Sequence, residues 1–267
     1  MTSMQMAWKI RRHAIEITHS SNSSHIGAVL SVADIVAVLY SGAMRVFPND
    51  PRNDLRDRFI MSKGHAGVAV YAALSERGFF PVEELNTYCT NGSMLSGHIS
   101  HYVPGVEVST GSLGHGISVA TGMALAAKMV GKNHTVFALV GDGECNEGTV
   151  WEAALFANHF RLNNFIVIID HNKLQSLGRC DDTMELLDLC GKWRSFGWEV
   201  REIDGHNHEE IRYALVRKNN TKPICIVAHT VKGKGISFME NNVSWHYRSP
   251  QGDDYAMAIK ELGAFTL

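Results

Sequence analysis

The sequence predicts an α/β fold built on a doubly wound parallel sheet, and three observations indicate it. Short stretches of continuous apolar residues recur along the 267-residue chain, which is typical of strands buried on both faces. Segments with helical periodicity lie between these stretches, as in alternating strand and helix units. No linker rich in proline, glycine or serine divides the chain, so we predict a single domain over residues 1–267.

The amino-terminal part carries helical patterns separated by turn-forming residues. An amphipathic segment comes first, and the polar run 20–25 that follows it is expected to be a loop. Asn49-Asp50-Pro51 is expected to interrupt regular structure, and the short apolar stretch 58–61 comes after it. The helices expected in this part cover residues 2–20, 31–42, and a run of small residues from Gly64-His65 to about Arg77.

From residue 90 on, a long loop is followed by regular alternation. Glycine and proline mark residues 90–110 as loop-like. A helix rich in alanine and glycine over 114–130 suits close packing against a sheet. The strands expected after it cover residues 134–140, 165–169, 198–203 and 224–228. The helices expected between and after these strands cover residues 146–161, 183–196, 208–219 and 253–262.

Composition and charge exclude several classes of protein. The formal net charge of −2 gives no reason to expect nucleic acid or an anionic membrane surface as a partner. No apolar stretch reaches the roughly 20 residues that span a bilayer, and the amino terminus lacks the apolar run of a secretory signal. The five cysteines are an odd number without a C-x-x-C pair, so we expect free thiols and a cytoplasmic protein.

Gly141-Asp142-Gly143 is the motif that points most directly to a ligand. It follows the expected strand 134–140 and precedes a helix, the position where ligands bind in open parallel sheets. The free N–H groups and the dipole of a helix N-terminus favour a phosphate, and the glycines permit a tight turn. Asp142 can lie beside a phosphate only with a cation between them. Mg²⁺ suits such a mixture of carboxylate, amide and phosphate oxygens.

Asn172 is the candidate second ligand for that cation. It follows the next expected strand, 165–169, about one crossover unit after Asp142. One right-handed crossover brings the ends of two such strands close together at the same edge of the sheet. A Gly-Asp-Gly turn alone is a weak signal, but together with Asn172 it predicts a magnesium and phosphate site.

This turn with its downstream asparagine resembles the thiamine-diphosphate signature, and the surrounding residues resemble transketolase in particular. The resemblance runs through Gly141–Gly148 and Asp170–Lys173. Further stretches that match transketolase motifs in order are residues 23–27, 57–66, 97–98 and 104–116. The resemblance covers nearly the whole chain and implies the thiamine-diphosphate-binding domain of that family.

Each matched position implies a role toward the cofactor. Asp142, Asn172 and the backbone carbonyl of Leu174 would hold Mg²⁺, or Ca²⁺ or Mn²⁺ in its place. The Gly143 N–H would meet the diphosphate. The family's cofactor supplies the nucleophilic carbon and the electron sink, so the reaction implied is transfer of a two-carbon ketol unit from a ketose to an aldose.

The matched histidines imply contacts with the cofactor and the sugar. His65 and His246 match residues at the diphosphate, whereas His25 and His98 match residues near the reactive carbon and the sugar's first hydroxyls. Histidines so placed would move protons and stabilise developing alkoxide charge. The remaining matched positions are Gly111 and Leu113, around the cofactor rings, and Glu147, which would link two active sites across a subunit interface.

Simpler interpretations stay open for part of this set. Glu147 could serve only the dipole of its own helix. Residues 232–235 could be a solvated turn, although the family places a loop over the diphosphate here. Tyr247 stands after His246, where the family commonly has glycine, and a bulky residue there is expected to reshape the mouth of the site. The histidines interpreted as structural or surface residues are His101, His115 and His171.

The chain has no segment that matches the parts following this domain in a complete transketolase. In the family, a second domain grips the pyrimidine ring and carries an activating glutamate. Residues 256–263 read as a finished helix with a glycine stop, so we expect a separate partner subunit rather than a truncated chain. The resemblance then implies a heterotetramer that acts on sugar phosphates and is inactive without that partner.

Three alternatives belong to other kinds of protein. A deoxyxylulose-phosphate synthase or a 2-oxo acid dehydrogenase subunit could use the same domain, although the loops with His25, His65 and His98 favour ketol transfer. A non-catalytic regulatory homologue is disfavoured by the intact Asp142 and Asn172. A nicotinamide dehydrogenase is disfavoured because no G-x-G-x-x-G follows a first strand.

Overall fold

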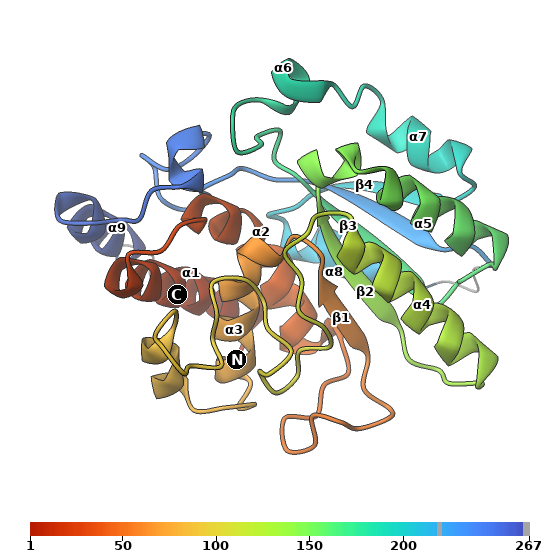
Figure 1. The fold of residues 1–267 in the computed structure, drawn as a ribbon, viewed down its shortest axis with the longest axis horizontal. Coiled ribbons are helices and arrows are strands. Elements are labelled where there is room, and N and C mark those ends of the chain that lie inside the picture. The colour runs from red at the N-terminus through yellow and green to blue at the C-terminus, as the bar shows by residue number, and fades with distance from the viewer. Residues whose placement is uncertain (218–220, 264–267) are drawn as a thin grey trace.

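The structure is a computed structural model that describes residues 1–217 and 221–263. Its centre is a five-stranded parallel sheet with the spatial order β1-β2-β3-β5-β4 (Figure 1). The apolar stretch after Asp57 forms an edge strand, and the other expected strands are present with slightly shifted bounds. The strands are β1 (Arg58–Met61), β2 (Val136–Gly141), β3 (Phe165–His171), β4 (Glu199–Asp204) and β5 (Ile224–His229).

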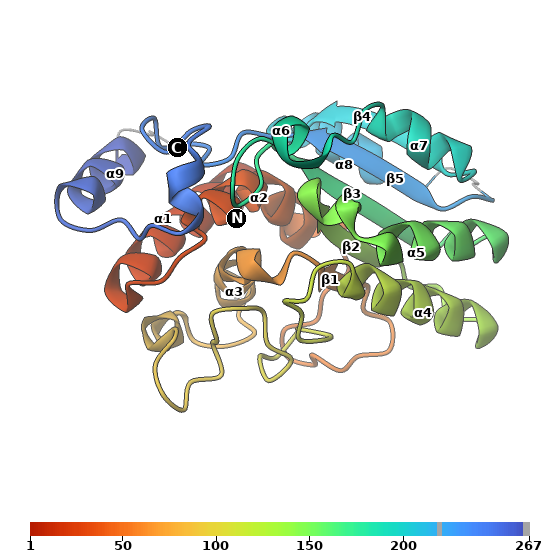
Figure 2. The same cartoon turned by 45° about the horizontal axis from the view of Figure 1, so that its top comes forward.

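Helices cover both faces of the sheet, which confirms the predicted doubly wound α/β architecture. Helices α1, α2, α3 and α8 lie on one face, with α9 packed against α1, and α4, α5 and α7 lie on the other (Figure 2). The helices are α1 (Ser3–Ser21), α2 (Ile26–Val38), α3 (Gly67–Glu76), α4 (His115–Met129), α5 (Gly148–His159), α6 (Cys180–Met184), α7 (Leu189–Ser195), α8 (His208–Leu215) and α9 (Asp253–Gly263).

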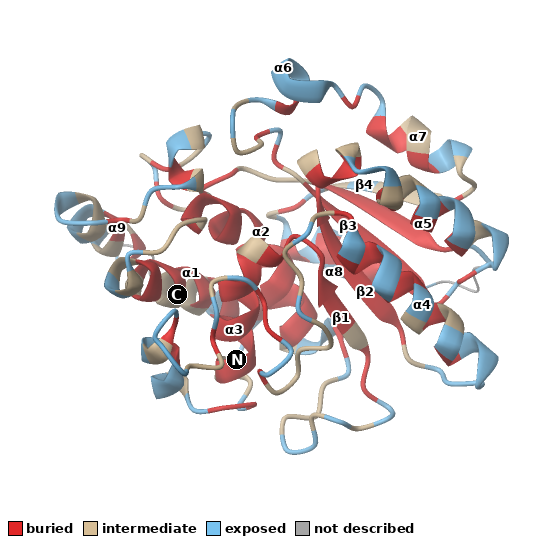
Figure 3. Cartoon of the chain, in the orientation of Figure 1, coloured by how far each residue is buried: buried red, intermediate tan, exposed pale blue. Residues whose placement is uncertain are grey.

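The central strands are continuously apolar because their side chains enter two different hydrophobic cores. In β2, Phe137 and Leu139 pack with the α1, α2 and α3 layer, whereas Ala138 and Val140 pack with the α4 and α5 layer. Since neither face meets solvent, every position along the strand favours an apolar residue. The outer strand β4 is only partly buried and is correspondingly more polar in sequence (Figure 3).

Helix α2 is apolar on all sides because it lies in the core. All 13 of its residues are buried, and it packs against α1, α3 and α8. Within the described residues, Ile26–Ala43 is the one segment long and apolar enough by length and composition to cross a membrane. However, 83% of that window is buried inside the fold, which is the environment of a core helix.

The start of α2 differs from the expectation of a helix over 31–42. The helix begins at Ile26, because His25 takes a left-handed backbone conformation (φ 75°) that turns the polar run directly into the first turn. Gly27 then packs closely against Trp245, whose carbonyl oxygen would lie 3.2 Å from an added Cβ atom. The first turn of the helix thus packs against a residue far away in the sequence, a contact that local propensity does not indicate.

The prediction of a single helix over 183–196 is wrong, because this part of the chain contains two short helices, α6 and α7. Asp188 interrupts it by capping α7, where its side chain accepts a hydrogen bond from the Gly191 N–H at 2.7 Å. Helix α8 ends at Leu215, before the expected end at 219; residues 218–220 lie outside the described part of the chain.

Candidate active site

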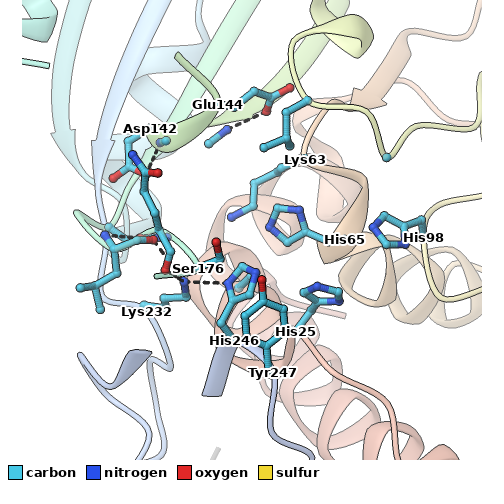
Figure 4. A pocket seen from close by; sticks show the side chains of 18 residues that line it. His25, Lys63, His65, His98, Asp142, Glu144, Ser176, Lys232, His246 and Tyr247 are labelled. Carbon is cyan, nitrogen blue, oxygen red and sulfur yellow. Dashed lines mark hydrogen bonds between the residues drawn. The ribbon is translucent and has the colours of Figure 1, made fainter. Parts of the chain in front are cut away.

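The carboxyl ends of β1, β2, β3 and β5 meet at one edge of the sheet, and the loops that follow them surround a pocket (Figure 4). It contains about 760 Å³ of unfilled space, part of which is open to solvent. The sequence-predicted residues that line it are His25, His65, His98, Gly111, Leu113, Asp142, Gly143, Asn172, Leu174 and His246. The lining residues that sequence reasoning missed or left open include Lys63, Glu144, Gln175, Lys232 and Tyr247.

Asp142 and Asn172 lie at the tips of neighbouring strands, as expected for two ligands of one cation. The Asp142 carboxylate accepts hydrogen bonds from the Gly143 N–H at 2.7 Å and from the Lys173 N–H at 2.5 Å. The Asn172 amide oxygen accepts from the Leu174 N–H at 3.0 Å. No cationic side chain pairs with Asp142 among the residues that the structure describes. Burial, with Asp170 nearby, raises the pKa of Asp142 to about 6.

Beneath this pair lies a fully buried charge, Asp170, that sequence reasoning missed. Its carboxylate forms a salt bridge with Lys63 at 2.5 Å and accepts hydrogen bonds from Ser31, Thr230 and Asn172. These partners come from α2 and from the ends of β1, β3 and β5. Although burial alone would raise the pKa of Asp170, Lys63 and the hydroxyl donors lower it overall. Asp170 therefore holds Asn172 and Lys63 in place beneath the pocket.

Lys232 lines the pocket, so residues 232–235 do not form a solvated turn. The side chain is only 2% exposed. Its ammonium donates to the carbonyls of Leu174 at 3.1 Å and Gln175 at 3.0 Å, and to His246 Nδ1 at 3.0 Å. Burial and the Lys63 charge lower the pKa of Lys232 to about 8. The Lys232 ammonium thus contacts the Leu174 carbonyl, the same oxygen that the resemblance to transketolase assigns to the metal ion.

A buried ionic cluster of Arg11, Asp34 and His206 bonds to the loop that carries Lys232. Asp34 forms a two-pronged ion pair with Arg11 and accepts a hydrogen bond from His206. The other ring nitrogen of His206 accepts the Val231 N–H at 2.9 Å, and Arg11 Nε donates to the Lys234 carbonyl at 3.0 Å. Because both sides of Lys232 are held in this way, its side chain is directed at the pocket.

His25 is the centre of a group of four histidines. Its ring centroid lies 5.2 Å from that of His65, 5.5 Å from that of His98 and 5.0 Å from that of His246. Burial, reinforced by nearby positive charges, lowers the pKa of His25 to about 4 and that of His246 to about 3. Both imidazoles are therefore neutral at pH 7, so each offers one nitrogen that accepts a proton and one that donates.

We expect the His25 imidazole of the unliganded chain to titrate near pH 4. Its ordinary pKa is 6.5, so between pH 6.5 and pH 4 the unfolded chain binds more protons than the folded chain. The contribution of His25 to stability therefore falls as the pH falls through that window. The titration can be followed by NMR of the imidazole Cε1–H signals, assigned with a His25→Asn variant and compared with the same chain in urea. A midpoint at or above 6.5 in the folded chain would contradict this expectation.

Glu144 connects three of the loops around the pocket. Its carboxylate accepts the Ser62 hydroxyl at 2.6 Å, the Gly114 N–H at 2.8 Å and the Gly141 N–H at 3.0 Å. It thereby ties the end of β1, the end of β2 and the start of α4 together. Burial raises the pKa of Glu144, and these three donors oppose the shift. Glu144 lies inside the matched motif, but only the folded chain brings its donors together.

Two predicted or questioned residues lie at the margin of the site. Glu147 is exposed at the start of α5 and does not line the pocket. Tyr247 lines the pocket at its open side, with its ring centroid 4.8 Å from that of His246. His101 and His115 are exposed and lie outside this pocket, as their interpretation as surface residues requires.

Comparison with known proteins agrees with this geometry. Residues 2–265 match the family model described as transketolase, thiamine diphosphate binding domain. The chain is 42% identical to one of the subunits of the apulose-4-phosphate transketolase of Phocaeicola vulgatus, over 95% of this chain and 91% of that one. It is 41% identical to a 6-deoxy-6-sulfo-D-fructose transketolase subunit of a Clostridium species, over 95% and 93% of the two chains.

The solved structures of longer transketolases contain the same fold. The transketolase of Campylobacter jejuni superposes with a TM-score of 0.91 at 32% identity, covering 97% of this chain and 43% of that chain. A transketolase variant from Pichia stipitis gives a TM-score of 0.93 at 30% identity, covering 98% of this chain and 40% of that chain. This chain thus spans about two fifths of the length of these enzymes. It belongs to the transketolase family and corresponds to the thiamine-diphosphate-binding domain of that family.

Proposed function

We propose that this chain is the cofactor-binding subunit of a two-chain transketolase, which transfers a two-carbon ketol unit from a ketose phosphate to an aldose phosphate. The observation that carries the proposal is that one pocket is lined both by the oxygen-bearing side chains of Asp142 and Asn172 and by Lys63, Lys232 and histidines. The first group offers oxygen ligands for a cation, and the second offers donors for an anion. A magnesium diphosphate needs both.

The donor set fits Mg²⁺ better than a metal bound by nitrogen or sulfur. The described residues contain no group of three or more His, Cys, Asp or Glu that could hold a metal alone. Asp142, Asn172 and the Leu174 carbonyl supply only oxygens, and Mg²⁺ completes such sites with phosphate oxygens and water. A cation bound here would also compensate the buried Asp142 charge, which has no cationic partner of its own among the described residues.

The diphosphate would be held by groups that now bond to one another. The Leu174 carbonyl would serve as a ligand of the cation, and the Lys232 ammonium, which now donates to that carbonyl, would instead donate to a phosphate oxygen. The Gly143 N–H, now bonded to Asp142, lies at the same turn and is the second proposed donor. His65 and His246 would add neutral N–H donors, since burial and nearby positive charges lower the pKa of both.

His25 and His98 are proposed to serve the reacting end of the site. When bound, thiamine diphosphate supplies the nucleophilic carbon and the electron sink for cleavage of a ketose. His25, neutral because its pKa is lowered to about 4, can accept a proton from a substrate hydroxyl and later return it. His98 is more exposed and lies 5.5 Å from His25 between ring centroids, where it would bind the sugar's first hydroxyls.

A partner subunit is proposed to supply the pyrimidine-binding part and to complete a heterotetramer. Two of the similar proteins are named as transketolase subunits, and this chain covers more than nine tenths of each. The outer faces of α4 and α5 are exposed (Figure 3), and large apolar residues are among the exposed ones there, as at a subunit interface. These exposed residues are Val119, Met129, Leu155, Phe156 and Phe160. Glu147, exposed beside this surface, is proposed to reach the neighbouring active site.

The test is reconstitution with the protein encoded by the neighbouring gene. We expect the mixture, with Mg²⁺ and thiamine diphosphate, to convert a five-carbon ketose phosphate and an aldose acceptor into the ketol-transfer products, whereas neither chain by itself does so. Products can be separated and quantified by mass spectrometry. Activity on pyruvate alone would indicate a synthase or dehydrogenase instead. Calorimetry that detects no binding of Mg²⁺ and thiamine diphosphate to the pair would indicate a non-catalytic homologue.

A further inference from the structure

The side chain of Tyr247 stands free at the mouth of the pocket. It is 63% exposed, and its ring centroid lies 4.8 Å from that of His246 and 6.3 Å from that of His25 (Figure 4). No described residue forms a hydrogen bond with its hydroxyl. The hydroxyl is therefore available to a bound molecule, and its ring adds an aromatic wall beside the two histidines.

The backbone on either side of Tyr247 is firmly anchored. Trp245 is buried, and the Arg248 guanidinium lies 4.6 Å above its ring centroid while also pairing with Asp254 at 2.8 Å. The Tyr247 and Arg248 N–H groups both donate to the Ser244 carbonyl, at 3.3 and 3.0 Å. The anchored backbone therefore holds Tyr247 at a defined place, although the Tyr247 hydroxyl itself forms no bond that stabilises the fold.

We infer that Tyr247 is a specificity-determining residue that contacts the outer carbons and hydroxyls of the sugar. This inference rests on the proposed function, in which His25 lies near the reacting carbon. Tyr247 is next to His25 on the outward side, so a polyhydroxylated chain that extends from that carbon to the opening passes its ring. An aromatic face packs against the carbon chain, and the phenol can donate to or accept from a sugar hydroxyl.

The position of the residue makes its effect depend on substrate length. A two-carbon aldehyde bound at the reacting carbon ends before Tyr247, whereas a five-carbon aldose phosphate extends past it. The phenol should therefore favour the long acceptor without affecting the short one. Cofactor affinity should be unaffected too, because the Tyr247 hydroxyl forms no hydrogen bond with any described residue proposed to hold the diphosphate.

The experiment compares Tyr247→Phe and Tyr247→Ala in the assembled two-chain enzyme, with the partner chain and thiamine diphosphate at saturation and one ketose phosphate donor. We expect Tyr247→Phe to lower kcat/KM for a five-carbon aldose phosphate by about three- to tenfold, the range for one hydrogen bond to an uncharged group. Tyr247→Ala should lower it further, because the ring contact is lost as well. For glycolaldehyde, kcat/KM should stay unchanged in both. Tyr102→Phe is the matched control, since Tyr102 is 75% exposed and lies outside this pocket.

Each other outcome overturns the inference in a different way. If the wild-type pair transfers ketol units but the variants match it for both acceptors, Tyr247 does not contact the sugar. If kcat/KM falls equally for both acceptors, the residue acts on the reacting centre and does not distinguish substrates by length. If the variants only weaken association of the two chains and recover fully at saturating partner, Tyr247 is an interface residue. A wild-type pair without ketol transfer would refute the proposed function itself, and this inference with it.

Discussion

The Asp142→Ala variant of the assembled enzyme is expected to lose more than about 100-fold in affinity for thiamine diphosphate with Mg²⁺. Mutation of a residue that only supports a metal ligand already lowers metal affinity about 10–100-fold. Turnover should fall with the bound cofactor. The carboxylate is the only charged oxygen ligand proposed for the cation, and without it two phosphates would face a wall of neutral oxygens. Isothermal titration calorimetry and the ketol-transfer assay measure the two losses separately.

The loss should concern binding and not folding. The pKa of Asp142 is raised from 3.8 to about 6, so at neutral pH the ionised carboxylate opposes folding of the unliganded chain. Removing that charge offsets part of the cost of the two lost N–H bonds, and the variant should remain folded in a thermal melt. Asp181→Ala is the matched control, because Asp181 is an exposed carboxylate in α6. Full cofactor affinity and turnover in Asp142→Ala would show that the cation site is wrongly placed.

The Asp170→Ala variant is expected to lose about 3–5 kcal/mol in the free energy of unfolding, the usual cost of leaving one partner of a buried salt bridge unpaired. The carboxylate is fully buried and is the ion-pair partner of Lys63, which is itself 2% exposed. Its removal leaves the ammonium uncompensated and also takes the acceptor from Ser31 and Thr230. Urea unfolding of the unliganded chain measures the loss.

A double variant separates the charge effect from the lost hydrogen bonds. Lys63→Met combined with Asp170→Asn removes both charges but keeps an amide oxygen that the hydroxyl groups of Ser31 and Thr230 can bond to. We expect it to be more stable than Asp170→Ala, since removing both charges of a buried pair leaves no uncompensated charge, whereas removing one does. An Asp170→Ala chain within about 1 kcal/mol of wild type, the centre of the distribution for ordinary substitutions, would show that the pair does not hold this part of the fold.

Local sequence predicts well those elements whose surroundings follow from the regular alternation of strands and helices along the chain. The continuous apolar residues of β2 and β3 indicate burial on both faces, and the structure confirms it. Position after these strands was enough to predict that Asp142 and Asn172 lie close together, because one right-handed crossover leaves little choice of geometry. By contrast, the predicted helix over 183–196 did not include the break at Asp188, although an aspartate can cap a helix that begins at the next residue.

The tertiary structure alone decided how the rest of the site is assembled. Lys63 and Asp170, Lys232 and His246, and His206 with Val231 are pairs formed between different loops. A loop's sequence indicates that it bends, but not which distant loop it meets, because that depends on the packing of every strand and helix between them. Burial, which changes the pKa of His25 and Lys232, is a property of that packing as well. The sequence therefore determined the sheet and the positions of Asp142 and Asn172 at its edge, whereas the convergence of cations, histidines and Tyr247 around them arises only when the whole domain folds.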